Sequence, residues 1–324
     1  LIGAFRSPVH TDIFSTVMRK FGDREKDVVA ISAAMIPGTG LKRFGNMFPN
    51  RMFDVGIAEE HAVNFAAGLA LGGLRPGVAI YSSFLQRAVD QILQDVCMQN
   101  LPVVFAVDRA GLVGSDGETH HGCFDLSYLS MMPNMTVMAP KNKWELSDML
   151  KFAIRQKGPV AIRYPRGEAY DGLQEHRDPV CMGKAEVIAR EGGIALLAVG
   201  SMVKIAQEAR RILKERGCRV TLVNMRFVKP LDTGLLDQLA EDHSLFVTLE
   251  ENVKSGGFGE AVLAAAARRK EKWPPVQVIA IEDQFVPQGS LRELLRRLGM
   301  DAEAVADRTY RWFEESKETD RREE

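Results

Sequence analysis

The chain has 324 residues, of which 46% are hydrophobic and 26% are charged, and this balance excludes a wholly disordered protein. Its length exceeds what one ordinary hydrophobic core covers, so we expect two domains. Lys and Arg number 42 against 43 Asp and Glu, a formal net charge of -1, which gives no electrostatic reason to expect a nucleic acid or a membrane as partner.

The cysteines and the N-terminus predict a cytoplasmic location. The four cysteines are scattered singly, with no CxxC pair and no metal-ligand spacing, so we expect reduced thiols and no metal site in this chain. The first residues lack the basic and apolar regions of a signal peptide, and no run reaches the ~18 apolar residues that a membrane span needs. The chain begins with Leu1 rather than Met, which favours a fragment of a longer protein.

The first half of the chain alternates predicted helices with short buried strands. Apolar residues at helical spacing predict a helix over 10–21, and Pro37 to Gly40 predict a loop. Further helices are expected from Glu59, over 84–98 and over 144–154, with a Gly-rich loop over 110–122. Strands are expected at 28–32, 53–55, 75–80, 103–107, 135–139 and 160–163. This alternation predicts a parallel sheet covered by helices on both faces.

The second half repeats the same type of pattern after a segment rich in Pro and Gly. We interpret 1–166 as one domain, 167–184 as a linker and 185–324 as a smaller second domain. The fold class is therefore α/β, with two domains that each contain a mostly parallel sheet covered by helices. Strands are expected at 194–199, 220–224, 245–249 and 276–281, and helices over 203–215, around Leu235, from Gly259 to Arg269 and from Leu291, with a frayed tail over 314–324.

Unusual polar residues of the first domain follow its predicted strands. They are Glu59-Glu60-His61, Tyr81 to Phe84 with Arg87, Asp108-Arg109 and the loop from Asp116 to His121. Ligands of open α/β sheets bind beyond the carboxyl ends of the strands, so this distribution predicts a binding site. Taken singly, Glu59 is equally well explained as an acid at a helix start, and a pair such as His120-His121 is more often an ordinary loop pair than a catalytic one. Arg109, Arg163 and Arg166 favour a phosphate or a carboxylate.

Two glycine-rich segments do not predict nucleotide binding. The loop 111–117 lacks the Gly-Lys-Ser/Thr ending of a phosphate-binding loop and the G-x-G-x-x-G spacing of a dinucleotide site. The turn Gly256-Gly257-Phe258-Gly259 resembles an anion site at a helix start, but we interpret it as a means of close packing.

Four segments together resemble a known enzyme family. They are Phe-Asp-Val-Gly-Ile-Ala-Glu-Glu-His-Ala-Val (53–63), Tyr-Ser-Ser-Phe-Leu-Gln-Arg-Ala (81–88), Asp-Arg-Ala-Gly-Leu-Val-Gly-Ser-Asp-Gly-Glu-Thr-His-His-Gly (108–122) and Arg-Tyr-Pro-Arg-Gly (163–167). In this order they are similar to the 1-deoxy-D-xylulose-5-phosphate synthases, transketolase-like enzymes that use thiamine diphosphate. The resemblance implies a pyrimidine-binding domain followed by a transketolase-like C-terminal domain.

The resemblance also implies roles for individual residues. Glu59 would bond the pyrimidine nitrogen of the cofactor and promote the imino tautomer that deprotonates the thiazolium carbon. Phe84 would stack on the aminopyrimidine, with Arg87 and Ile57 beside it. The implied pocket for glyceraldehyde 3-phosphate contains Tyr81, Arg109, Asp116, His120 and Arg166, with Arg163 as a second candidate for the phosphate. His120 would also transfer protons, so Glu59 and His120 are the implied catalytic residues.

The chain departs from the family in one respect. Family members begin with a further domain, whose Gly-Asp-Gly…Asn motif holds magnesium and the cofactor's diphosphate, and this chain has no such motif. We therefore expect the chain to contact only the pyrimidine end of thiamine diphosphate, with Mg²⁺ held in the missing N-terminal domain or subunit. We also expect a homodimer that is inactive alone. The substrates implied are pyruvate and glyceraldehyde 3-phosphate, in isoprenoid precursor and thiamine/pyridoxal biosynthesis.

Two alternatives remain open from the sequence. A β subunit of a 2-oxo acid dehydrogenase has the same two domains but passes its acyl group to a lipoyl arm. A truncated product that only dimerises, or only binds a partner, would have no catalysis. Arg109, Arg166 and the loop from Asp116 to His121 favour the synthase over the dehydrogenase.

Overall fold

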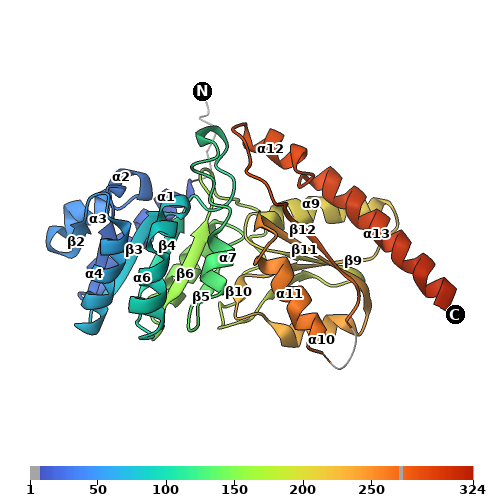
Figure 1. Ribbon diagram of the computed structural model, residues 1–324, viewed down its shortest axis with the longest axis horizontal. Coiled ribbons are helices and arrows are strands. Elements are labelled where there is room, and N and C mark those ends of the chain that lie inside the picture. Colours follow the sequence, from blue (N-terminus) through green and yellow to red (C-terminus); the bar gives the residue numbers. More distant parts are fainter. Residues whose placement is uncertain (1–7, 270–272, 324) are drawn as a thin grey trace.

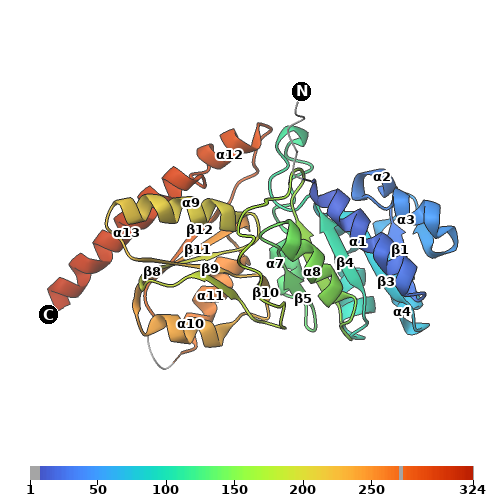
Figure 2. The same cartoon turned by 180° about the vertical axis from the view of Figure 1, so that it is seen from behind.

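Two sheets of mainly parallel strands organise the computed structural model, which describes residues 8–269 and 273–323 (Figure 1). The sheets lie side by side, and each is covered by helices on both faces (Figures 1 and 2). The expected fold class is confirmed.

The first sheet has seven strands in the order β10-β5-β6-β4-β3-β1-β2. Only β10 is antiparallel to its neighbour. The strands are β1 (Val28–Ser32), β2 (Met52–Asp54), β3 (Arg75–Tyr81), β4 (Val104–Asp108), β5 (Thr136–Met138), β6 (Val160–Tyr164) and β10 (Phe227–Lys229). The central strands β1, β4 and β6 are buried along their whole length, which explains their unbroken apolar runs.

Helices α1 (His10–Arg24) and α8 (Lys143–Ala153) cover one face of this sheet, and α4 (Glu59–Leu71) and α7 (Asp125–Ser130) cover the other (Figures 1 and 2). The expected single helix over 84–98 is wrong. Its place is taken by α5 (Ser82–Leu85), a 3-10 turn (Gln86–Ala88), α6 (Val89–Gln91) and a π-helical turn (Ile92–Cys97). The expected loop at 37–40 is mostly α2 (Ile36–Thr39), and α3 (Lys42–Met47) and α7 were not predicted.

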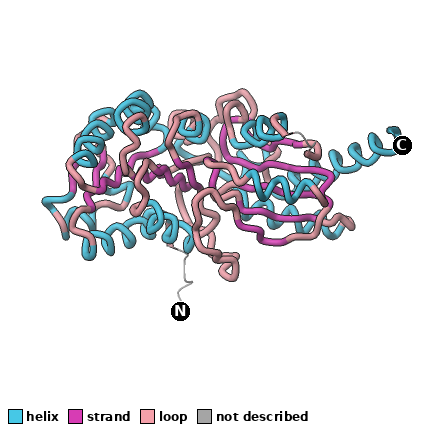
Figure 3. Tube along the Cα trace, turned by 90° about the horizontal axis from the view of Figure 1, so that it is seen from below, coloured by secondary structure: helices cyan, strands magenta, loops and turns pink. Residues whose placement is uncertain are grey.

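The second sheet has five strands in the order β12-β11-β8-β9-β7, with only β7 antiparallel. These are β7 (Glu186–Ala189), β8 (Gly193–Ala198), β9 (Val220–Asn224), β11 (His243–Val253) and β12 (Val276–Ile281). The helices are α9 (Met202–Glu215), α10 (Thr233–Ala240), α11 (Phe258–Ala267), α12 (Leu291–Arg297) and α13 (Ala302–Glu323). The tail over 314–324, expected to be frayed, is helical through Glu323, and Glu324 lies outside the described residues; α13 projects past the second sheet (Figure 3).

The two halves of the chain share structure. Strand β10 lies in the second half of the sequence, yet it pairs with β5 at the edge of the first sheet. One hydrophobic cluster contains Val63 and Phe105 from the first half together with Leu236, Phe246 and Phe258 from the second. The segment 165–185 joins β6 to β7 without a helix or strand of its own. The domain bounds 1–166, 167–184 and 185–324 stay a prediction.

Two further observations concern the chain as a whole. All four cysteines are free, and of these Cys97, Cys123 and Cys218 are buried while Cys181 is exposed. Among the described residues, no helix has the length and apolar character that crossing a membrane requires.

Candidate active site

Glu59 is a buried carboxylate at the first position of α4, with 2% of its surface exposed. Beneath it the helix presents the small apolar side chains of Ala62, Val63 and Ala66, all fully buried. Arg87 Nη1 donates to Glu59 Oε2 at 3.2 Å, and the side chain of Arg87 is 53% exposed. Glu59 is therefore a buried carboxylate packed against apolar side chains, at the positive end of the helix dipole.

Two aromatic rings lie at the carboxyl end of strand β3, Tyr81 as its last residue and Phe84 just beyond it. The rings of Tyr81 and Phe84 are stacked with centroids 5.8 Å apart. The guanidinium of Arg87 lies 5.8 Å from the centroid of the Phe84 ring, and His120 meets the same ring edge to face at 5.5 Å. Phe84 thus joins the Glu59–Arg87 pair to the loop that contains His120.

Arg109 follows strand β4 in the left-handed backbone region, with a φ of 59°. This conformation places its guanidinium 3.8 Å from the centroid of the Tyr81 ring. Its Nε atom is buried and has no hydrogen-bond partner. Burial raises the pKa of the Tyr81 phenol, so the hydroxyl beside this cation stays protonated.

Arg166, beyond the end of β6, donates from Nη1 to Asp116 Oδ2 at 2.5 Å. This hydrogen bond lowers the pKa of Asp116. Arg166 is 44% exposed, so the pair faces solvent. Most of the residues predicted from the sequence are thus connected by contacts. The contacts run from Glu59 to Arg87, Phe84, Tyr81 and Arg109, and His120 lies beside Phe84. The Arg166–Asp116 pair lies at the same edge of the sheet.

Two predicted site residues are placed differently. Arg163 is only 4% exposed. Its Nε and Nη2 atoms donate hydrogen bonds to the carboxylate of Asp125 at 3.1–3.2 Å. Its Nη2 atom also donates to the backbone oxygens of Gly122 and Glu251. Burial acts to lower the pKa of Arg163, but the charge and hydrogen bonds of Asp125, together with the charge of Glu251, outweigh burial and raise the pKa. Arg163 is thus an internal ion-pair partner rather than an exposed anion ligand. Ile57, by contrast, is 78% exposed.

Sequence reasoning missed Glu250, Glu251 and Asn252, three consecutive buried polar residues that precede Val253, the last residue of strand β11. Glu251 accepts hydrogen bonds from Leu112 N and Ser201 Oγ, and Asn252 Oδ1 accepts from Leu126 N. Burial raises the pKa of Glu250 to about 7 and also raises that of Glu251. The signal was present in the sequence, since these residues follow a predicted buried strand as the first-domain clusters do.

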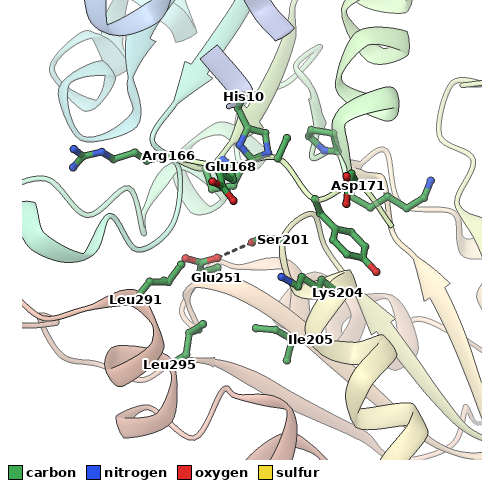
Figure 4. A pocket seen from close by; sticks show the side chains of 15 residues that line it. His10, Arg166, Glu168, Asp171, Ser201, Lys204, Ile205, Glu251, Leu291 and Leu295 are labelled. Carbon is green, nitrogen blue, oxygen red and sulfur yellow. Dashed lines mark hydrogen bonds between the residues drawn. The ribbon is translucent and has the colours of Figure 1, made fainter. Parts of the chain in front are cut away.

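A cavity of about 350 Å³ lies between the two halves of the chain (Figure 4). Its lining includes His10, Arg166, Tyr170, Lys204 and Glu251. It shares Arg166 with the candidate site, but none of Glu59, Phe84 or Arg109 lines it. Within the described ranges, no group of three or more His, Cys, Asp or Glu side chains is arranged to hold a metal ion.

The fold and this site define a class of protein. Residues 7–171 match the family "Transketolase, pyrimidine binding domain", and residues 183–305 match "Transketolase, C-terminal domain". The chain therefore belongs to the transketolase family. Its similarity within that family is to proteins named 1-deoxy-D-xylulose-5-phosphate synthase.

Two such relatives illustrate the similarity. The protein from Lachnoclostridium phytofermentans is 54% identical over 302 residues, which cover 93% of this chain and 48% of the relative. The protein from Clostridium tetani is 49% identical over 296 residues, covering 91% of this chain and 48% of the relative. The chain thus spans about half the length of the curated relatives it matches.

Solved structures share the whole two-sheet architecture. A chain described as "Split gene transketolase, inactive beta4 tetramer" superposes with a TM-score of 0.82 at 27% identity, covering 94% of this chain and 98% of that chain. Transketolase from Campylobacter jejuni gives a TM-score of 0.78 at 17% identity, with 95% of this chain covering 47% of that one. The second comparison supports the fold alone.

Proposed function

We propose that the chain forms the pyrimidine-binding and C-terminal part of a cytoplasmic thiamine diphosphate-dependent 1-deoxy-D-xylulose-5-phosphate synthase. Such an enzyme decarboxylates pyruvate and joins the remaining two-carbon unit to glyceraldehyde 3-phosphate, in isoprenoid precursor biosynthesis. The observation that carries the proposal is the cluster extending from Glu59 to Arg109 and Arg166. It places a buried carboxylate at one end and two arginines, suited to a phosphate, at the other.

The residues at the Glu59 end fit the pyrimidine of the cofactor. Arg87, the partner of Glu59, is half exposed, so its side chain can change rotamer and point into solvent. This change frees a carboxylate oxygen of Glu59 for a ring nitrogen of the pyrimidine. Phe84 offers an aromatic face next to that pair. When bound, thiamine diphosphate supplies the carbon nucleophile that attacks the keto carbon of pyruvate. Glu59 holds the proton shared with the pyrimidine and, being buried, keeps water from it.

The arginine end fits an aldehyde that carries a phosphate. Arg109 has a buried Nε–H without a partner, which an anionic oxygen would satisfy. Arg166 is favoured over Arg163 as a phosphate ligand, because Arg166 is exposed whereas Arg163 is buried against Asp125. His120 lies at the edge of Phe84, between the two ends, where it can transfer a proton. Tyr81 offers a neutral hydroxyl as a hydrogen-bond donor.

The chain alone is proposed to be inactive. Mg²⁺ and the diphosphate would be bound by the part of the relatives that this chain does not match, supplied as a domain or as a subunit. The split-gene transketolase chain of the same extent is described as an inactive tetramer, which supports both inactivity and self-association of such a chain. We propose a homodimer as the minimal unit. The relatives' names give no support to the 2-oxo acid dehydrogenase alternative.

Reconstitution tests the proposal. The purified chain, mixed with a separately produced N-terminal half of the Lachnoclostridium phytofermentans relative, thiamine diphosphate and Mg²⁺, is expected to form 1-deoxy-D-xylulose 5-phosphate from pyruvate and glyceraldehyde 3-phosphate. The chain without that half should form none. Acylation of a lipoyl domain instead would identify a dehydrogenase subunit, and product from the chain alone would contradict the proposed incompleteness.

The same mixture tests the role of Glu59. Glu59→Gln keeps the shape but not the charge, so turnover should fall by about 100-fold or more, the range typical of lost acid–base catalysis. Glu60→Gln is the matched control, because Glu60 is the exposed next residue of α4 and should keep nearly full turnover. A Glu59→Gln variant that keeps most of its rate would remove Glu59 from the mechanism.

A further inference from the structure

The substrate loop, residues 110–122, is closed at its base by two glycines. Gly111 and Gly122 exchange backbone hydrogen bonds, N to O, at 2.7 and 2.8 Å. Gly111 has a φ of +77°, and a Cβ there would lie 2.6 Å from the carboxylate of Glu251. The loop contains Asp116 and His120, so the position of its base determines where these side chains lie.

Glu251 joins this base to the second half of the chain. Its Oε1 atom accepts from Leu112 N at 2.6 Å. Its Oε2 atom accepts from Ser201 Oγ at 2.6 Å, the hydrogen bond drawn in Figure 4. Ser201 immediately precedes helix α9, and Glu251 is 4% exposed. Short hydrogen bonds to a buried carboxylate are among the stronger ones in proteins, and losing the acceptor leaves a buried N–H unpaired.

The rest of the loop also forms hydrogen bonds with the second half of the chain. His121 Nδ1 accepts from Val113 N at 3.1 Å, and His121 Nε2 lies 3.4 Å from Pro287 O. Gln288 Nε2 donates to Ser115 O at 2.9 Å. The loop that contains two predicted substrate ligands is therefore held from base to tip by residues of the second half, beside α12 (Figures 1 and 2).

We propose that Glu251 is a positioning residue that fixes the substrate loop, so the C-terminal half of the chain governs recognition of the phosphate-bearing aldehyde. Glu251 acts through Leu112 N, since its carboxylate bonds the loop base. The inference rests on the proposed function for the identity of the substrate. It predicts that binding of the aldehyde phosphate depends on Glu251, whereas the Glu59–Arg87 pair, to which Glu251 makes no hydrogen bond among the described residues, keeps its arrangement.

Hydrogen exchange of the chain itself gives a test independent of activity. In Glu251→Ala, the amides of 112–121 should exchange at least 10-fold faster, while those of α8 stay unchanged. Glu251→Gln should restore most of the protection, because its amide can accept from Leu112 N and donate to Ser201 Oγ. Glu250→Gln is the matched control. Glu250 accepts from Phe258 N and Gly259 N at 2.7 Å, so only α11 should respond.

The outcomes separate the inference from the proposed function. Unchanged hydrogen exchange of the 112–121 amides in a folded Glu251→Ala variant would overturn the inference about Glu251. If that variant does not fold, Ser201→Ala must show a smaller increase in the same segment, and no increase would overturn the inference equally. In the reconstituted enzyme, Glu251→Ala should raise KM for glyceraldehyde 3-phosphate about 10-fold and lower kcat, because the loop contains both Asp116 and His120, while KM for pyruvate changes little. An equal rise in KM for pyruvate would indicate a merely structural role. An inactive wild-type mixture would contradict the proposed function, while the exchange result would still decide on the loop.

Discussion

Asp108 ends strand β4 as a buried carboxyl group, with 1% of its surface exposed. Burial raises its pKa to about 7, although the charge of Arg109 and a hydrogen bond from Thr11 act in the opposite direction. In the unfolded chain the group ionises near its ordinary value of 3.8. Folding therefore favours the protonated acid. The stabilisation due to Asp108 is fully present below pH 3.8 and is lost as the pH rises through about 7.

Asp108→Asn removes this titration while keeping the shape of the side chain. The free energy of unfolding of the variant, relative to the unmodified chain, should rise between about pH 4 and pH 7 and then level off, because only the unmodified chain must ionise a buried acid. The rise is at most about 4 kcal/mol, at ~1.4 kcal/mol per pKa unit. Urea unfolding at a series of pH values measures it. Asp90→Asn, at an exposed position of α6, should show no such trend, and a pH-independent difference for Asp108→Asn would contradict the raised pKa.

Most candidate site residues were predictable one by one, because a polar side chain directly after an apolar run marks the carboxyl end of a strand. Glu59, Tyr81 and Arg109 were found in this way. Which of Arg163 and Arg166 is the better phosphate ligand was not predictable, since both flank Pro165 in the sequence. Only the fold shows that Asp125 forms an ion pair with Arg163.

Helix α11 begins in close contact with the second sheet. A Cβ at Gly259 would lie 2.5 Å from Val278 Cγ1 and 2.7 Å from Thr248 Oγ1. The two amides at this helix start already donate to the carboxylate of Glu250. The interpretation of the 256–259 turn as a means of close packing is confirmed, and the anion at the helix start is one of the protein's own side chains.

A pair of glycine substitutions tests this packing. Gly259→Ala should lower the free energy of unfolding by about 1–3 kcal/mol, since strand atoms must move to admit the methyl group. Gly68→Ala, inside α4, should raise it by about 0.5–1 kcal/mol, because nothing lies within 4 Å of the new Cβ and alanine favours the helix. Chemical unfolding of both variants provides the comparison. Equal effects of the two substitutions would show that helix propensity, rather than contact with the sheet, decides.

Among the elements, strands with a continuous apolar run and helices with an apolar period over several turns were predictable. Strands β1, β9 and β12 have the expected bounds. The elements that were missed are short. Helices α2 and α7 and strands β7 and β10 have three to six residues, too few to show a period. The segment 86–97 has a helical apolar pattern, yet the structure divides it into 3-10, α and π turns.

A buried ion network joins the two halves of the molecule. Lys141 Nζ lies 2.5 Å from Glu186 Oε2, and Arg226 contacts Glu145 at 2.9 Å and Glu186 at 2.7 Å. All four side chains are 1–3% exposed, and two positive charges balance two negative ones. Although burial acts to raise the pKa of Glu186, the hydrogen bond from Lys141 and the charge of Arg226 keep it lowered.

Arg226→Met should destabilise the whole chain, because it leaves two buried carboxylates with a single cation. Breaking such a buried network typically costs about 3–5 kcal/mol. Thermal or urea unfolding should show the loss in both halves together, since the network spans them. Arg190→Met, which removes the exposed ion pair with Asp242, should have little effect. A similar small effect for Arg226→Met would mean that the network does not contribute to stability.

By itself, the sequence determined the α/β class, the alternation of buried strands with helices and most of the candidate site residues, because these depend on local apolar patterns and on the rule that ligands bind at strand ends. Only the tertiary structure decided that β10 completes the first sheet, that Arg163 is internal and that Glu251 accepts a hydrogen bond from Leu112 N in the 110–122 loop. These three features depend on contacts between residues far apart in the chain. No local pattern records such contacts, because the partner that buries or bonds each group is fixed only when the two sheets pack.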